Sequence, residues 1–283
     1  MASLAGKLAD ARTRLAAAGI APEEAAIDVS LYARTLLAWD TATLLAEQTG
    51  PVPMGLEPRF SEWIERRSQR EPSAYIVGVR EFYGLDFRVS PDVLIPRPET
   101  EIIVDQALPL LGRLAQPRVA DVGTGSGCLA ITIAHEVSAS TVVATDLSYA
   151  ALAVAKDNAR RLGVSERVAF VATSYLDAVG GVFDLIVANP PYVRDGDKPG
   201  LAKAVRYEPE VALFGGADGM RDVSAVLDAA ARTLAPGGWL LMEFGYGQED
   251  GVIAQARARD ALRFDRVVSD FQDIPRTVIV QHR

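Results

Sequence analysis

The spacing of apolar residues divides the chain into two different parts. In roughly the first 79 residues, apolar positions recur every three or four residues, as on one face of an α-helix. The first such set comprises Leu4, Leu8, Ala11 and Leu15. Gly19 follows this set and favours the end of a helix, and Pro22 suits the first turn of the next one. The pattern predicts a small helical domain over residues 1–79.

A turn signal and a proline-rich segment follow the helical part. In residues 81–90, aromatic and apolar side chains flank Gly84, which favours a turn between two short strands. Pro96 and Pro98 fix the backbone φ and disfavour helix, so the segment around them is expected to be stiff and extended. We expect residues 80–97 to form a β-hairpin linker, and the proline segment to be linker alone or linker and pocket wall.

The remaining residues, 98–283, alternate between strand-length apolar runs and helical patterns. The expected strands are residues 118–123, 141–146, 167–172, 183–188, 238–245, 264–270 and 276–281. Such alternation predicts an α/β fold, in which helices cover both faces of a doubly wound, mostly parallel sheet of seven strands.

Composition excludes several classes of function. The chain of 283 residues has one cysteine, Cys128, and two histidines, so we expect no intramolecular disulfide and no metal site. The formal net charge of −8 argues against a general nucleic-acid binder. The start does not read as a signal peptide, and the apolar runs are too short for a membrane span. We therefore expect a cytoplasmic protein, without membrane attachment, that acts as a monomer.

A glycine-rich loop follows the first expected strand of the sheet. Residues 123–127 read Gly-Thr-Gly-Ser-Gly, which is typical of a plain turn, a dinucleotide loop or another nucleoside site. Asp146 ends the next strand, where a carboxylate can accept hydrogen bonds from both hydroxyls of a ribose. Asp121, ahead of the glycines, is placed to meet a cationic amino group or to organise the loop. An ammonium group and a ribose without a pyrophosphate indicate S-adenosyl-L-methionine, with S-adenosyl-L-homocysteine as product.

The strand at residues 183–188 ends in Asn189-Pro190-Pro191-Tyr192. Two consecutive prolines cannot continue a central strand, so the chain leaves the sheet rigidly. Asn189 and the backbone carbonyls offer hydrogen-bond acceptors, and Tyr192 offers a flat face. Acceptors that hold both N–H groups of a planar amide would orient its nitrogen and favour the positive charge developing on it. A rigid turn with a capping asparagine is the alternative interpretation.

From about Ser73 to its end, the chain resembles the bacterial release factor glutamine methyltransferases, the HemK or PrmC family. The matching stretches include LIPRPETE, DVGTGSG, NPPY, YEPEVALFGGADGM and LAPGGWLLMEFG. The resemblance implies a Rossmann-like methyltransferase fold that methylates the side-chain amide N5 of the glutamine in the GGQ loop of class I peptide chain release factors. It implies that the helical domain docks the release factor. The residues implied to clamp the glutamine are Asn189, Pro190, Pro191 and Tyr192.

The resemblance also places the cofactor. The complete expected set is Asp121, Gly123, Thr124, Gly125, Ser126, Gly127, Asp146, Leu147, Ser174, Tyr175 and Asn189. The family commonly has an acidic and then a bulky residue near the adenine, whereas this chain has Thr173-Ser174-Tyr175. We expect Ser174 to bond the adenine amine and Tyr175 to lie against the ring, with Asp177 as a substitute one turn away. Residues 99–101 lie either near the pocket mouth or in a solvated first helical turn.

Three other functions remain open from the sequence. A flat amino group on a nucleic-acid base fits the same clamp, although the acidic chain argues against such a substrate. A ribosomal-protein glutamine is another possible substrate, because a related enzyme class shares NPPY. A cofactor-binding sensor or scaffold is the third alternative, but a binder has no use for a nucleophile clamp.

Overall fold

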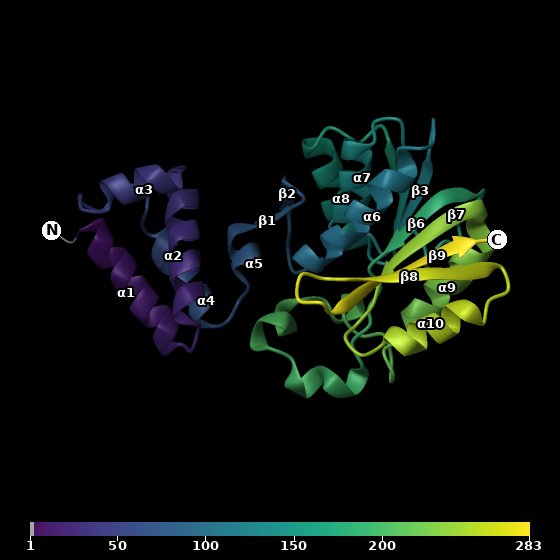
Figure 1. The fold of residues 1–283 in the computed structure, drawn as a ribbon. Helices are drawn as coiled ribbons and strands as arrows, with labels where there is room; N and C mark the ends of the chain where they lie inside the picture. Colours follow the sequence, from purple (N-terminus) through teal and green to yellow (C-terminus); the bar gives the residue numbers. More distant parts are fainter. Residues whose placement is uncertain (1–2) are drawn as a thin grey trace. The chain divides into compact units, whose positions relative to one another are not determined.

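A computed structural model describes residues 3–283 of the chain, which form two compact units (Figure 1). One unit consists of residues 3–78 and Ala202–Tyr207. The other consists of Val79–Leu201 and Glu208–Arg283. The division of the chain into a docking domain, a linker and a methyltransferase domain stays a prediction, as do its boundaries.

The first unit is helical. Its elements are α1 (Leu4–Ala17), α2 (Pro22–Leu37), α3 (Thr41–Glu47), α4 (Arg59–Ser68), α5 (Ser73–Val77) and the 3-10 turn η3 (Lys203–Tyr207). All four apolar residues of the first sequence pattern are buried on α1, as the spacing predicts. Helix α3 was not predicted, and it begins where the Asp40 side chain accepts a hydrogen bond from the Thr43 N–H at 2.7 Å. In η3, the Tyr207 hydroxyl donates to the Gln69 carbonyl at 2.9 Å.

A buried arginine ties helices α2 and α4 of this unit together. Arg67 is 4% exposed, and its Nε donates to Asp28 at 2.7 Å. Its other guanidinium nitrogens pair with Glu24 and donate to the Glu71 carbonyl. Asp28 is itself buried, so Arg67 supplies the charge that compensates its carboxylate.

We expect Arg67→Leu to lower the free energy of unfolding by about 3 kcal/mol, because the substitution leaves Asp28 buried without its cation. Calorimetric unfolding of the full chain measures this loss. Arg14→Leu is the matched control, since Arg14 and Glu65 form an exposed pair that contributes at most about 1 kcal/mol. Equal losses in the two variants would contradict this account.

The second unit contains the sheets and the remaining helices. Its strands are β1 (Val79–Phe82), β2 (Leu85–Arg88), β3 (Arg118–Val122), β4 (Thr141–Asp146), β5 (Val168–Ala172), β6 (Phe183–Ala188), β7 (Leu234–Glu243), β8 (Leu262–Ser269) and β9 (Pro275–His282). Its helices are α6 (Glu101–Leu111), α7 (Cys128–Glu136), α8 (Tyr149–Arg161), α9 (Arg221–Thr233) and α10 (Glu249–Arg257). Its 3-10 turns are η1 (Pro98–Thr100), η2 (Asp195–Gly200) and η4 (Glu210–Ala212).

The predicted hairpin and the predicted α/β fold are both confirmed. Strands β1 and β2 pair antiparallel with Phe82 opposite Leu85, and the two turn residues, Tyr83 and Gly84, both have positive φ. This is the geometry of the two-residue turns that match strand twist. The seven-stranded sheet has the order β5-β4-β3-β6-β7-β9-β8, and only the β7–β9 and β8–β9 pairs are antiparallel.

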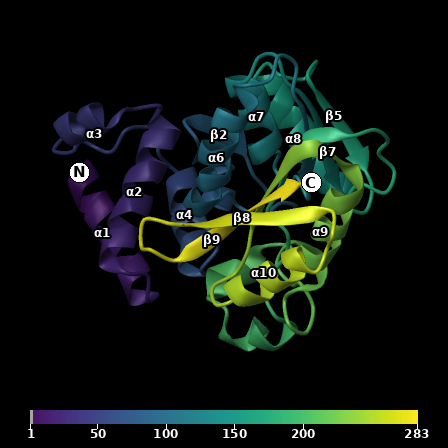
Figure 2. The same ribbon diagram turned by 45° about the vertical axis from the view of Figure 1, so that its right-hand side comes forward.

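Helices cover both faces of the seven-stranded sheet (Figures 1 and 2). Neighbouring residues of β3 pack against different helical layers. Val119 of β3 belongs to the apolar core formed with α6, α7 and α8. Its neighbour Ala120 belongs to the core formed with α9 and α10. A strand that is buried on both faces reads as a continuous apolar run, which is the pattern the sequence shows. No helix within residues 3–283 is long and apolar enough to cross a membrane.

Candidate functional site

The sheet reverses its strand order beside β3, and a cavity lies at this point. Strands β4 and β5 lie to one side of β3, and β6, β7, β9 and β8 lie to the other. Ligands of doubly wound folds bind at such a reversal, outside the carboxyl ends of the strands. The cavity has a volume of about 310 Å³ and is lined by the residues that follow β3, β4 and β6. Its size is that of a small-molecule site.

Asp146 organises the glycine-rich loop from the end of β4. Its Oδ2 accepts a hydrogen bond from the Gly125 N–H at 2.9 Å, and its Oδ1 accepts one from the Ser148 N–H at 2.8 Å. Each carboxylate oxygen has a second lone-pair direction, so Asp146 retains capacity for a ligand. Gly123 and Gly125 both have positive φ, and open space lies where a Cβ would stand. Their backbone is therefore open to a ligand in the cavity.

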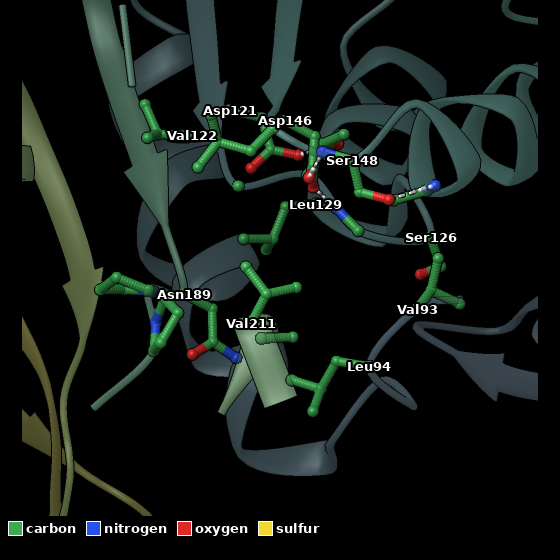
Figure 3. Close-up of a pocket in the computed structure, with 18 of the residues that line it drawn as sticks. Val93, Leu94, Asp121, Val122, Ser126, Leu129, Asp146, Ser148, Asn189 and Val211 are labelled. Atoms are coloured by element: carbon green, nitrogen blue, oxygen red, sulfur yellow. Dashed lines mark hydrogen bonds between the residues drawn. The ribbon is translucent and has the colours of Figure 1, made fainter. Parts of the chain in front are cut away.

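Asp121 is a buried carboxylate of which one oxygen accepts two hydrogen bonds and the other accepts none from the described residues. Its Oδ2 accepts hydrogen bonds from the Thr124 hydroxyl at 2.6 Å and the Ala130 N–H at 3.1 Å. Its Oδ1 is buried and has no hydrogen-bond partner within residues 3–283. Burial raises the pKa of Asp121 to about 7, and the two hydrogen bonds offset only part of that rise. Figure 3 shows Asp121 and Asp146 on one side of the cavity and Asn189 across from them. An oxygen of this kind fits a cationic ligand group.

Tyr175 reaches the cavity from the loop after β5. Its backbone has a positive φ of 48°, which is uncommon for a non-glycine residue. Its hydroxyl donates to Asp222 at 2.8 Å, and the other carboxylate oxygen of Asp222 pairs with Arg221 at 2.8 Å. The pair therefore holds the tyrosine in place from the start of α9. Burial and the Asp222 charge raise the pKa of Tyr175 to about 12, so the phenol stays neutral.

The NPPY turn after β6 is braced by the segment that contains FGGADG. Val193 N–H donates to the Leu213 carbonyl, and Gly215 N–H donates back to the Val193 carbonyl, both at 2.9 Å. Gln248 Nε2 donates to the Tyr192 carbonyl at 3.0 Å. A Cβ on Gly219 would lie 2.2 Å from that same carbonyl oxygen. The two backbones can approach this closely only because a glycine stands there.

The proline segment forms part of the cavity wall, which was one of the two expectations for it. Pro96, Arg97 and Thr100 all line the cavity. Glu208 is buried, pairs with Arg97 and accepts a hydrogen bond from the Ile95 N–H at 3.3 Å. This carboxylate thus joins LIPRPETE to the start of EPEVALFGG, two stretches that are far apart in the sequence.

The structure brings most of the predicted site residues together around this cavity. The predicted residues that line it are Asp121, Gly123, Thr124, Gly125, Ser126, Asp146, Leu147, Tyr175, Asn189, Pro190 and Pro191. Gly127, Ser174 and Tyr192 do not line it, as far as the described residues show. Gly127 is the N-cap residue directly before α7, where a Cβ would meet Ile131 and Ala155. The individual roles of all these residues stay predictions.

Several lining residues were missed by the sequence analysis. Arg221 and Asp222 stand at the start of α9 and carry no motif of their own. Val211 projects into the cavity from η4 although the residue is largely exposed (Figure 3). Thr173 lines the cavity beside Tyr175, where Ser174 was expected. The available signal was indirect. Val211 lies inside the matching stretch YEPEVALFGGADGM, Arg221 and Asp222 follow that stretch directly, and Thr173 precedes two predicted residues.

Comparison with known proteins identifies the family. Residues 7–78 match the PrmC N-terminal domain, and residues 102–206 match the methyltransferase small domain. The release factor glutamine methyltransferase of Bradyrhizobium diazoefficiens is 42% identical over 261 residues, which cover 90% of this chain and 88% of that protein. The enzyme of the same name from Moorella thermoacetica is 40% identical and covers 98% of this chain and 97% of that protein.

The chain belongs to the release factor glutamine methyltransferase family. Two solved structures share the fold at low sequence identity. The hMettl16 catalytic domain in complex with a MAT2A 3'UTR hairpin aligns with a TM-score of 0.59 at 15% identity, covering 76% of this chain and 81% of that chain. A methyltransferase from Pyrococcus furiosus aligns with a TM-score of 0.52 at 17% identity, covering 71% and 90%. The resemblance predicted from the motifs is therefore confirmed, and the protein is a methyltransferase.

We expect Gly219→Ala to reduce the methyl-transfer rate by about 100-fold, because the added Cβ displaces the NPPY turn and a misplaced site loses positioning. Gly196→Ala is the matched control, since Gly196 has open space at its Cβ and no positive φ. Steady-state rates on a common substrate measure the effect. A rate within twofold of the unmodified protein for both variants would show that the close approach is dispensable.

Proposed function

We propose that this protein transfers a methyl group from S-adenosyl-L-methionine to the side-chain amide of the glutamine in the GGQ motif of class I release factors. The products are the N5-methylated glutamine and S-adenosyl-L-homocysteine. The observation that carries this proposal is the position of Asn189 and Pro190, at the end of β6 and in the wall of a nucleoside-sized cavity. The family relationship over nearly the whole chain supports the choice of substrate.

The cavity fits S-adenosyl-L-methionine in three respects. The unpartnered Oδ1 of Asp121 would meet the ammonium group. Asp146 would hold the ribose with its remaining lone pairs, and Tyr175, fixed by Asp222, would lie against the adenine. Ser174 stays the proposed partner of the adenine amine, although the residue itself is not among those that line the cavity. When bound, the cofactor supplies an electrophilic methyl group on a positively charged sulfur.

The residues of the turn would hold the substrate amide. An amide nitrogen is a weak nucleophile, because its lone pair is delocalised into the carbonyl. Asn189 would accept one N–H through its side-chain oxygen, and Pro190, which has no N–H of its own, would accept the other through its carbonyl. Both acceptors stabilise the nitrogen as it becomes tetrahedral and gains positive charge. A strong base is unnecessary in this scheme, since the alkylated nitrogen is acidic and releases its proton afterwards.

The helical unit would contribute to recognition of the release factor. It matches the PrmC N-terminal domain, and the cavity itself is lined entirely by the other unit.

Incubation with labelled S-adenosyl-L-methionine tests the function directly. Purified release factor, a ribosomal-protein fraction, RNA and DNA are offered separately, and mass spectrometry locates the methyl group. We expect label on the GGQ glutamine and most of that label to be lost in Asn189→Ala, which removes one acceptor of the clamp. Asn189→Ala should still bind the cofactor, because the proposed contacts from Asp121, Asp146 and Tyr175 remain in that variant. Label on RNA, DNA or another protein in place of the release factor would overturn the choice of substrate.

The affinity for S-adenosyl-L-methionine should rise with pH up to about 7. Below that pH the Asp121 carboxyl is protonated and neutral, so a cationic ligand must displace the proton before it can pair. With the pKa of Asp121 at about 7, affinity falls by about tenfold per pH unit below this value. Titration calorimetry at pH 5.5–8 measures the effect.

Asp121→Asn is the control, because the amide has no ionisation in this range. This variant should bind the cofactor weakly and with much less dependence on pH, and any titration of the ligand itself remains visible in it. Parallel pH profiles for the two proteins would show that Asp121 does not pair with the ammonium group.

A further inference from the structure

A chain of hydrogen bonds leads from Asn189 to a buried carboxylate outside the set of predicted site residues. Asn189 Nδ2 donates to the Thr100 hydroxyl oxygen at 3.1 Å. The Thr100 hydroxyl donates to Glu243 Oε2 at 2.6 Å. Glu243 Oε1 accepts a further hydrogen bond from the Tyr192 hydroxyl at 2.9 Å. The chain thus joins the start of α6, the NPPY turn and the end of β7.

The direction of each bond in this chain follows from the one before it. Both oxygens of Glu243 accept a hydroxyl proton, Oε2 from Thr100 and Oε1 from Tyr192, so the single proton of the Thr100 hydroxyl points to Glu243. The Thr100 oxygen then has only lone pairs to offer Asn189. Asn189 must therefore present its NH2 group to Thr100, which leaves its side-chain oxygen as the atom that can accept from a substrate.

Because these groups are buried, water cannot supply hydrogen bonds in place of the ones they make with each other. Glu243 and Thr100 are each 2% exposed, and the ring of Tyr192 carries a hydroxyl whose pKa burial and the Glu243 charge raise far above its usual value. Burial also raises the pKa of Glu243, and its bonds from Thr100 and Tyr192 oppose that rise. A buried polar chain of this kind is stable only when every donor meets an acceptor.

We propose that Thr100 and Glu243 are positioning residues that fix which end of the Asn189 amide faces the substrate. The proposal rests on the proposed function, in which the Asn189 oxygen accepts an N–H of the target amide. Reversal of the asparagine would set its NH2 group against the substrate NH2 group. Both groups are donors, so the clamp would lose one of its two hydrogen bonds.

Glu243→Gln and Thr100→Val test the proposal with side chains of nearly the same shape. Glutamine keeps one acceptor oxygen but presents an NH2 donor in place of the other, so it cannot accept from both hydroxyls, and valine removes the hydroxyl of Thr100. We expect each variant to lower kcat/KM for the release factor by at least about tenfold, since an unpaired or reversed buried group weakens the clamp. Affinity for S-adenosyl-L-methionine should stay within twofold. Thr100→Ser, which keeps the hydroxyl, should recover most of the rate that Thr100→Val loses.

Thr277→Val is the matched control, because it also removes a buried threonine hydroxyl beside Glu243. Thr277 pairs with Glu243 across β7 and β9, is fully buried, and its hydroxyl has no partner among the described residues. Its substitution should leave kcat/KM unchanged. In an Asn189→Ala background, Glu243→Gln should lower kcat/KM less than twofold further, because the proposed effect acts through Asn189. A further decrease as large as the one that Glu243→Gln causes alone would overturn the proposal.

Spectroscopy supplies a measurement that needs no substrate. The chain has two asparagines, Asn158 and Asn189, so selective 15N labelling gives two pairs of side-chain amide signals. Asn158 serves as internal reference, because its Nδ2 donates to the Ser126 carbonyl at 2.9 Å and to the Arg88 carbonyl at 3.0 Å. We expect Glu243→Gln and Thr100→Val to shift the Asn189 pair and to leave the Asn158 pair in place.

The outcomes separate this proposal from the proposed function. If both variants shift the Asn189 signals but the unmodified protein does not methylate release factor, the positioning network is supported and the proposed substrate is wrong. Unshifted signals together with full activity of Glu243→Gln on release factor would overturn the network and leave the function standing.

Discussion

The close approach of two backbone turns is the constraint on which the candidate site depends. The NPPY turn cannot extend β6, because its prolines lack N–H groups and fix φ. It must therefore be held from outside the sheet, and the FGGADG segment does so at a distance that tolerates no side chain. A Cβ on Gly215 would lie 2.4 Å from the Pro191 carbonyl oxygen, and one on Gly219 would lie still closer to that of Tyr192. The position of Asn189 at the cavity follows from this packing.

Three buried carboxylates organise the surroundings of that turn, and their bonding differs. Asp121 keeps one oxygen without a partner among the described residues, which suits a cationic ligand. Glu208 has a cationic partner in Arg97 and joins two distant segments of the chain. Within residues 3–283, Glu243 accepts hydrogen bonds from two neutral hydroxyls, and its burial raises its pKa. A buried carboxylate loses its hydration and needs hydrogen-bond or charge partners in its place. The kind of partner that each of the three has indicates whether it serves a ligand, joins segments or positions a neighbour.

Features that depend on neighbours close in the chain were predictable from the sequence, whereas features that depend on distant partners were not. The buried face of α1 and the turn at Tyr83-Gly84 depend on neighbours a few residues away, and both were predictable from spacing and residue type. The glycine loop and Asp146 were also accessible, because parallel strands bring their carboxyl ends to one edge. Helix α3 was not predicted, because it is short and its single buried residue, Leu44, sets up no repeating apolar pattern. Asp222 was not predicted as a site residue, because its partner, Tyr175, lies 47 residues away in the sequence.

By itself, the sequence determined the α/β class, the hairpin, the family and the part of the cavity wall formed by the glycine loop, Asp146 and the NPPY turn. These follow from periodicity, from the restricted backbones of glycine and proline, and from motifs that are local in the chain. Only the tertiary structure decided which oxygen of Asp121 is left without a partner, what braces the NPPY turn and which way the Asn189 amide points. Those properties depend on hydrogen bonds among Thr100, Asn189 and Glu243, which come from three separate segments. No local pattern encodes a direction that is set by a partner more than 50 residues away.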